Sequence, residues 1–315
     1  MRAIAVDRFK GEARLVEIAQ PSPKPNQLLV QIAATAINPF DWKVADGIME
    51  GAMPAVFPLV LGQDAAGTIT AVGDEVTRFK PGERVFGQFF HSPVGEGTFA
   101  EYAVVPETGT VAALPAEIAF DTAAALPTAG MTALSLVETL DLKPGANVLI
   151  VGATGGVGSF ATQLAAANGL RVLATAGAKD TERLRHLGAS ELFNSRNEAL
   201  IQDVKRAHPD GIQGLIDVVS DGAALTALSG LVSSGGSVLT TVFAADEKAL
   251  SARGIRGGNF EVKGSSALLT RLADVVKSGK LLAPIEQTIS LEEAPAAIVR
   301  SRAGHSGGKT VIRLR

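Results

Sequence analysis

Residues 147–176 read NVLIVGATGGVGSFATQLAAANGLRVLATA, and this stretch decides the fold. It opens with the apolar run Val148–Val151, which has the length of a buried strand, and continues with glycines at 152, 155, 156 and 158. A segment of helical periodicity follows, Gly169 ends it, and residues 171–175 form a second β-branched run. This order within about 30 residues predicts a βαβ unit that binds a dinucleotide. The alternative is a glycine turn that only packs a helix onto a sheet.

The glycine turn explains how such a unit binds phosphate. Glycine permits positive φ and lets the backbone approach a pyrophosphate closely. The helix that starts there directs unpaired N–H groups and its positive dipole end at the phosphates. We therefore expect the turn residues to bind the cofactor, namely Thr154, Gly155, Gly156 and Val157.

Composition limits the class of protein. The chain has 315 residues, of which 46% are hydrophobic and 19% charged, and its formal net charge is −3. A slightly acidic chain predicts neither a nucleic-acid nor a membrane partner. The absence of cysteine excludes disulfides and thiolate metal sites. With no signal-like start and no apolar run of membrane-spanning length, we expect a cytoplasmic protein.

The chain changes character near residue 120. Short apolar and β-branched runs separated by proline and glycine fill residues 1–110 and favour a barrel-like β domain. Strands then alternate with helices, which predicts a doubly wound parallel sheet in an α/β fold. We expect a dinucleotide-binding domain over 122–263 and a discontinuous domain over 1–121 and 264–315. The stretch 244–260 fits no pattern.

Several motifs in a fixed order resemble the medium-chain dehydrogenase/reductase superfamily, on its zinc-independent quinone oxidoreductase and enone reductase branch. These motifs are Asn38-Pro39-x-Asp41, residues 57–67 (FPLVLGQDAAG), 80–85 (KPGERV), 97–102 (GTFAEY), 125–133 (ALPTAGMTA), the glycine turn, and Gly307-Gly308-Lys309. The resemblance implies a GroES-like β-barrel-type domain plus a Rossmann domain, with the active site between them. It also implies a homodimer formed by sheet edges near Ser237–Phe243 and the following segment.

Zinc members of the superfamily carry a Gly-His-Glu run, where this chain has Gly62-Gln63-Asp64. The four histidines form no close pair with metal-ligand spacing. We therefore expect no metal, and hydride transfer to an acceptor that is already electrophilic, such as a quinone or an α,β-unsaturated carbonyl. A reversible alcohol dehydrogenase is an alternative that would need a metal.

The end of the second strand of the βαβ unit predicts which nicotinamide binds. An NAD enzyme places an acidic residue there to hold the ribose 2′-hydroxyl. Here the strand ends at Thr175 without a carboxylate, and Lys179 follows, so we expect NADP(H). NADPH-using quinone oxidoreductases often show an Asn-Tyr-Arg run after the third strand. This chain has Asn194-Ser195-Arg196, so Ser195 and Arg196 are the candidate contacts to the 2′-phosphate.

The resemblance assigns further cofactor contacts along the chain. Thr241, Val242 and Phe243 would end the sixth Rossmann strand, where their backbone would meet the carboxamide of the cofactor. The remaining contacts that it implies are Asn38 beside the nicotinamide, Thr128 at a phosphate or ribose, and Lys309 in the small-residue-plus-lysine signature.

Residues 38–43 (NPFDWK) are expected to begin a short helix or turn, and two of them are the catalytic candidates. Lys43 would order the cofactor or feed a proton to the reduced acceptor, and a solvated turn lysine is the alternative. Asp41 is the second candidate, although capping the turn or orienting Lys43 is the favoured interpretation. A different class of function also remains, namely a non-catalytic NADPH-binding redox sensor or structural protein of the same fold.

Overall fold

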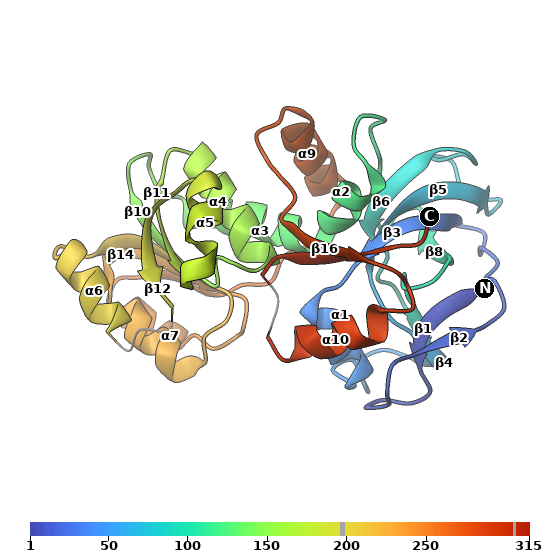
Figure 1. Ribbon diagram of the computed structural model, residues 1–315, viewed down its shortest axis with the longest axis horizontal. Coiled ribbons are helices and arrows are strands. Elements are labelled where there is room, and N and C mark those ends of the chain that lie inside the picture. The colour runs from blue at the N-terminus through green and yellow to red at the C-terminus, as the bar shows by residue number, and fades with distance from the viewer. Residues whose placement is uncertain (196–198, 305–306) are drawn as a thin grey trace. The chain divides into compact units, whose positions relative to one another are not determined.

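A computed structural model describes residues 1–195, 199–304 and 307–315 (Figure 1). By their contacts these residues form two compact units. The first unit comprises Met1–Met131 and Gly264–Arg315, and the second comprises Thr132–Lys263.

The first unit is built on two β-sheets. The larger sheet has the order β16 (Ile285–Ile289), β17 (Lys309–Arg313), β3 (Gln27–Ala36), β5 (Asp64–Val72), β6 (Arg84–Gln88) and β9 (Thr110–Ala113), with β8 (Tyr102–Pro106) also paired to β3. The smaller sheet has the order β2 (Arg14–Glu17), β1 (Arg2–Val6), β4 (Ala55–Val60) and β7 (Val94–Glu96). Because β17 pairs antiparallel with β3, the C-terminal segment completes this N-terminal domain.

Four helices and the start of a fifth are described in the first unit, namely α1 (Pro39–Ala45), α2 (Phe120–Ala125), α9 (Ser266–Lys277), α10 (Ala294–Arg302) and the first turn of α3 (Pro127–Leu140). Helix α2 packs on β3 and β5. For this reason residues 122–131, which the sequence pattern placed in the second domain, group with the first unit. None of the helices in the described part of the chain is long and apolar enough to cross a membrane.

The second unit contains a parallel six-stranded sheet. Its order is β12 (Ala189–Asn194), β11 (Arg171–Ala176), β10 (Asn147–Val151), β13 (Ile212–Asp217), β14 (Val232–Thr240) and β15 (Arg256–Asn259). Numbered along the chain this is 3-2-1-4-5-6, the strand order of the Rossmann fold. The apolar runs read from the sequence form its buried centre, where Leu149, Leu173 and Leu215 are fully buried.

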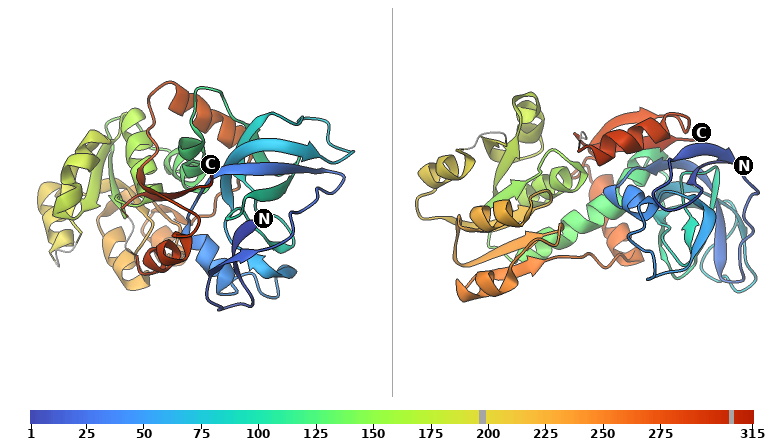
Figure 2. Two further views of the ribbon diagram at one scale, coloured as in Figure 1. Left: turned by 45° about the vertical axis from the view of Figure 1, so that its right-hand side comes forward. Right: turned by 90° about the horizontal axis from the view of Figure 1, so that it is seen from below.

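Helices cover both faces of this sheet. They are α4 (Gly156–Ala167), the 3₁₀ turn η1 (Ala178–Asp180), α5 (Thr181–His186), α6 (Leu200–Ala207), α7 (Gly222–Ser229) and α8 (Glu247–Ala252). Figure 1 shows α4 and α5 on one side of the sheet and α6 and α7 on the other, and Figure 2 gives two further views of them. The mixed α/β architecture predicted from the sequence is therefore confirmed.

At the end of the second unit the predicted strand number was wrong, and the predicted sheet edge was right only for the segment that follows Phe243. Residues 241–243 do not end the sixth strand, because β14 is the fifth strand and stops at Thr240. The unassigned stretch 244–260 supplies α8 and the sixth strand, β15. Since β14 lies between β13 and β15, Ser237–Phe243 is not a sheet edge, and β15 in the following segment is.

Candidate active site

The glycine turn of the second unit joins β10 to α4 and has two positions where only glycine fits. Gly152 has a φ of +85°, a conformation that side chains rarely adopt. A Cβ on Gly158 would lie 2.2 Å from the carbonyl oxygen of Gly152, so α4 crosses the end of β10 with no room for a side chain. These two glycines therefore bring the first turn of α4 directly over the strand end.

The start of α4 fits a phosphate group. Its first backbone N–H groups, at Gly156 and Val157, begin a helix of twelve residues after the N-cap Gly155. A Cβ built on Gly155 would meet only the carbonyl oxygen of Gly152, at 3.6 Å, so the space in front of the turn is open. The Arg183 guanidinium donates to the Thr154 carbonyl oxygen at 3.0 Å and holds the turn in place.

The end of β11 combines a buried hydroxyl with open space. The Thr175 side chain is buried, and its Oγ1 accepts a hydrogen bond from the Gly152 backbone N–H at 3.3 Å. A Cβ on Gly177 would meet no atom within 4 Å, and Lys179 is exposed. The Ser195 N–H donates to the Ala176 carbonyl oxygen at 3.1 Å, which places Ser195 beside this strand end. Arg196 lies outside the described residues.

The segment after β14 lies at the same carboxyl edge of the sheet. The Thr241 N–H donates to the Asp217 carbonyl oxygen at 3.2 Å, and the Val242 N–H donates to the Thr240 hydroxyl oxygen at 3.2 Å. Phe243 has a φ of +56° and is 60% exposed. The predicted contacts of the second unit that are described therefore gather at one edge, where ligands of this fold class bind.

A different arrangement is found in the first unit, where a polar cluster joins four buried residues and the half-buried Thr128 from distant parts of the chain. The buried residues are Asn38, Asp41, Asp64 and Lys309. The Lys309 ammonium donates to Asn38 Oδ1 at 2.7 Å, and the Asn38 amide donates to Asp64 Oδ2 at 2.9 Å. The Thr128 hydroxyl donates to Asp64 Oδ1 at 2.6 Å, and the Asn38 backbone N–H donates to Asp41 Oδ2 at 2.6 Å.

Charge in this cluster is unbalanced, because two carboxyls face one ammonium. The Lys309 Nζ lies 3.8 Å from Asp64 Oδ2, so Lys309 is the counter-ion of Asp64. Burial raises the pKa of Asp41 to about 8, and the nearby Asp64 charge raises it too. The hydrogen bond from the Asn38 N–H and the charge of Lys309 act in the opposite direction and lower it. Burial also raises the pKa of Asp64 and lowers that of Lys309. Asp41 accepts from fewer donors than Asp64, so its charged form has less compensation for burial.

The two catalytic candidates lie in different surroundings although both are on α1. Lys43 is exposed, and its Nζ lies 5.8 Å from the centre of the Trp42 ring. Asp41 is buried, accepts from the Asn38 N–H at the start of α1, and also lines a pocket. Asp41 therefore combines the capping contact that the sequence favoured with access to a cavity.

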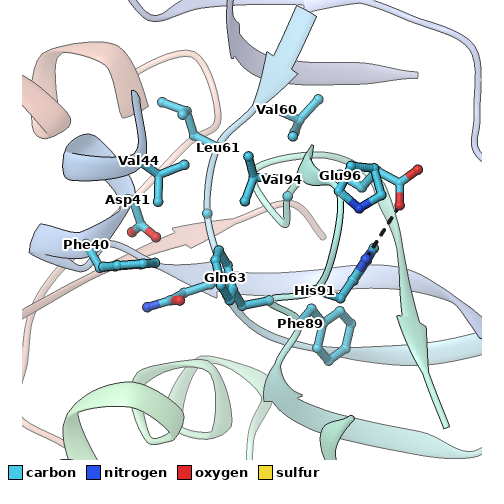
Figure 3. A pocket seen from close by; sticks show the side chains of 15 residues that line it. Phe40, Asp41, Val44, Val60, Leu61, Gln63, Phe89, His91, Val94 and Glu96 are labelled. Carbon is cyan, nitrogen blue, oxygen red and sulfur yellow. Dashed lines mark ion pairs between the residues drawn. The ribbon is translucent and has the colours of Figure 1, made fainter. Parts of the chain in front are cut away.

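The pocket lies within the first unit and is partly open to solvent. Its walls are α1, the end of β4 with residues 61–63, and residues 89–97. Figure 3 shows Asp41 and Gln63 on one side, His91 and Glu96 on the other, and apolar side chains between them. The lining suits a largely apolar group with polar atoms at both ends.

Gln63 connects this pocket to the polar cluster. Its side-chain amide donates to the Thr128 hydroxyl oxygen at 3.1 Å, and the Gln88 amide donates to the same oxygen at 3.0 Å. Thr128 and Lys309 are expected to contact the cofactor. In this structure the Thr128 hydroxyl donates to Asp64 and the Lys309 ammonium donates to Asn38. Across residues 1–195, 199–304 and 307–315, the His, Asp and Glu side chains form no group of three or more that could hold a metal ion.

The sequence analysis did not identify four polar residues of the pocket or the cluster as site residues, namely Gln63, Asp64, His91 and Glu96. Asp64 was quoted as part of a motif but not as a site residue, and its apolar strand context was a usable signal for a buried carboxylate. His91 and Glu96 lie in or next to an irregular segment without periodicity, so nothing in the sequence brought them together.

The sequence matches two family models, the alcohol dehydrogenase GroES-like domain over residues 24–116 and the zinc-binding dehydrogenase family over residues 187–312. It is 31% identical to a chloroplast envelope quinone oxidoreductase homolog of Arabidopsis thaliana, over 99% of this chain and 98% of that protein. It is 36% identical to a human quinone oxidoreductase over 76% of this chain and 72% of that protein. The solved quinone oxidoreductase of Coxiella burnetii superposes with a TM-score of 0.89 at 28% identity, covering 100% of this chain and 99% of that one. The chain therefore belongs to the quinone oxidoreductase branch of the medium-chain dehydrogenase/reductase superfamily.

Proposed function

We propose that this oxidoreductase uses NADPH, without zinc, to reduce a quinone or an α,β-unsaturated carbonyl compound. The observation that carries the proposal is Asp41, whose carboxyl has a pKa raised to about 8 and lines a pocket with Phe40, Phe89 and Phe90. An acceptor of this kind is flat and apolar, and its reduction requires one hydride and one proton.

The preference for NADPH is supported by the end of β11. No carboxylate occupies Thr175–Lys179, where an NAD enzyme would hold the ribose 2′-hydroxyl. Open space at Gly177, the Lys179 ammonium and the Ser195 hydroxyl suit a 2′-phosphate. When bound, the nicotinamide supplies the hydride, and the residues of this chain have only to hold and orient it.

Asp41 is the proposed proton donor. Hydride addition to an enone develops negative charge on the carbonyl oxygen, and a neutral carboxylic acid nearby can donate a proton to the reduced product. After the proton has left, the Asp41 carboxylate accepts a hydrogen bond from the Asn38 N–H, and the charge of Lys309 stabilises this carboxylate. Lys43 is the weaker candidate, because its ammonium is exposed beside Trp42.

A direct assay tests this function. Oxidation of NADPH and NADH is followed with 1,4-benzoquinone, 9,10-phenanthrenequinone and short 2-alkenals, in wild type and Asp41→Asn. We expect turnover with NADPH, and a kcat about 100-fold lower in the variant with bound cofactor unchanged. Tight NADPH binding without turnover of any acceptor would instead favour the non-catalytic redox sensor or structural protein.

Three further properties are proposals that separate measurements can test. A homodimer through the β15 edge predicts twice the chain mass of 32.4 kDa by light scattering. Metal analysis of active protein should find far less than one zinc per chain. Residence in the cytoplasm is our third proposal, although the Arabidopsis relative is named for the chloroplast envelope.

A further inference from the structure

Glu96 and His91 form the side of the pocket that faces Asp41 in Figure 3. Glu96 ends β7, and its backbone pairs with Val60 of β4. The His91 side chain is only 8% exposed, and that of Glu96 is 29% exposed. Because Glu96 lies on a paired strand, its backbone has a defined place on the pocket wall.

Both ring nitrogens of His91 lie near backbone carbonyl oxygens. Its Nε2 lies 3.1 Å from the Val104 carbonyl oxygen, and its Nδ1 lies 3.4 Å from the Ser92 carbonyl oxygen. The closest carboxylate oxygen, Glu96 Oε2, is 3.7 Å from Nδ1, which is an ion-pair distance but too long for a hydrogen bond. The His91 ring therefore lies beside Glu96 without donating a hydrogen bond to its carboxylate.

Glu96 Oε2 is an acceptor in need of a donor. This atom is buried and accepts no hydrogen bond from any residue in the described part of the chain. Buried polar groups in native proteins are almost always paired, so an unpaired one at a pocket wall indicates a ligand or water position. Since a carboxylate only accepts, the matching group must donate.

The pocket favours a neutral donor over a cationic one. Apart from its polar ends it is lined by apolar side chains such as Val44, Leu61 and Val94. Moving an ammonium group from water into such a lining costs far more than moving a hydroxyl. His91 is also the nearby group that can balance the Glu96 charge when protonated.

We propose that Glu96 binds a hydroxyl group on the acceptor, at the end of the molecule remote from the carbonyl that faces Asp41. The preferred substrates are then quinones or enones that carry a hydroxyl substituent. This inference deepens the proposed function and rests on it, because the pocket must be the acceptor site.

A matched pair of acceptors tests the proposal. We compare 6-(hydroxymethyl)-1,4-naphthoquinone with 6-(methoxymethyl)-1,4-naphthoquinone, which carries its substituent at the same remote position but cannot donate. Wild type should show a kcat/KM about tenfold higher for the hydroxymethyl compound, as expected for a hydrogen bond to a charged acceptor. Glu96→Ala should lose this preference, so that the ratio of kcat/KM values for the two compounds falls to about one.

Two further variants complete the design. Glu75 is exposed and outside the pocket, so Glu75→Ala should retain the tenfold preference. If Glu96→Ala does not fold, Glu96→Gln keeps the shape of the side chain and an uncharged acceptor, and should keep only part of the preference.

The inference can fail independently of the proposed function. Equal kcat/KM for both quinones in wild type, or a preference that survives Glu96→Ala, would overturn it while leaving the reductase proposal intact. If wild type with bound NADPH reduces neither quinone, the reductase proposal fails, and titration calorimetry of the two compounds decides the inference. Tighter binding of the hydroxymethyl compound that depends on Glu96 supports it, and equal binding rejects it.

Discussion

The polar cluster of the first unit and the glycine turn of the second unit are built in opposite ways. The turn uses backbone groups, and its residues follow one another from Gly152 to Gly158. The cluster uses charged side chains, and the bond from Lys309 to Asn38 spans 271 positions. A local site needs glycine where a side chain would collide, whereas a distributed site needs every buried partner to be present. Breaking each one should therefore have different consequences.

Removing the centre of the cluster should have the largest effect. Asp64→Ala deletes the acceptor of the Thr128 hydroxyl and the Asn38 amide, and leaves the Lys309 ammonium buried without its counter-ion. Breaking a buried pair on one side costs about 3–5 kcal/mol, and we expect a loss of that size in urea denaturation. Asp74→Ala changes an exposed aspartate and should cost less than about 0.5 kcal/mol.

A double variant sharpens this result. Replacing Lys309 by Met as well removes the orphaned charge, so Asp64→Ala/Lys309→Met should be less destabilised than the sum of the single variants. Additive losses would show that the two residues do not act as a pair.

The cluster should also make stability depend on pH through Asp41. Its pKa is about 8 in the folded protein against 3.8 ordinarily, so between these values the folded state holds a proton that the unfolded state releases. The contribution of Asp41 to the free energy of unfolding should thus be highest below pH 4 and should fall as pH rises to about 8. Between pH 5 and pH 9 this contribution should fall by on the order of 4 kcal/mol.

Asp41→Asn isolates this contribution because asparagine does not titrate and keeps an oxygen for the Asn38 N–H. The variant should gain stability relative to wild type as pH rises, measured by urea denaturation at a series of pH values. Parallel profiles for the two proteins would rule out a raised pKa at Asp41.

The glycine turn should fail for steric reasons. A Cβ at position 158 would lie 2.2 Å from the Gly152 carbonyl oxygen, so Gly158→Ala must push α4 away from β10. We expect a loss of roughly 2 kcal/mol in stability and a large decrease in NADPH affinity, measured by denaturation and calorimetry. Gly222→Ala is the matched control, since its Cβ would come no closer than 3.6 Å to another residue. Unchanged NADPH binding in Gly158→Ala would show that the turn does not cradle the cofactor.

The same contrast explains what the sequence could predict. The strand, turn and helix around Gly152 follow from local periodicity and glycine spacing, so they could be read directly. Asp41 and Lys309 were named from motifs, but their shared contacts with Asn38 depend on how β17 pairs with β3. The Glu96 position depends on strand pairing with β4 and carries no periodic signal. Short β15, with two glycines among its four residues, could not be distinguished from a loop.

The smallest expected effect concerns the end of β11, where the second unit uses a side chain rather than the backbone. Lys179 is exposed, so its contribution to 2′-phosphate binding is screened by solvent and should be modest. Lys179→Ala should raise KM for NADPH about tenfold at low salt and leave KM for NADH unchanged, because NADH lacks the phosphate. The difference between variant and wild type should shrink as salt is added. Lys205→Ala, at an exposed lysine in α6, should change neither value. An equal rise in KM for both cofactors would mean that Lys179 supports the strand end itself, and the 2′-phosphate contact would then fall to Ser195 and its neighbours.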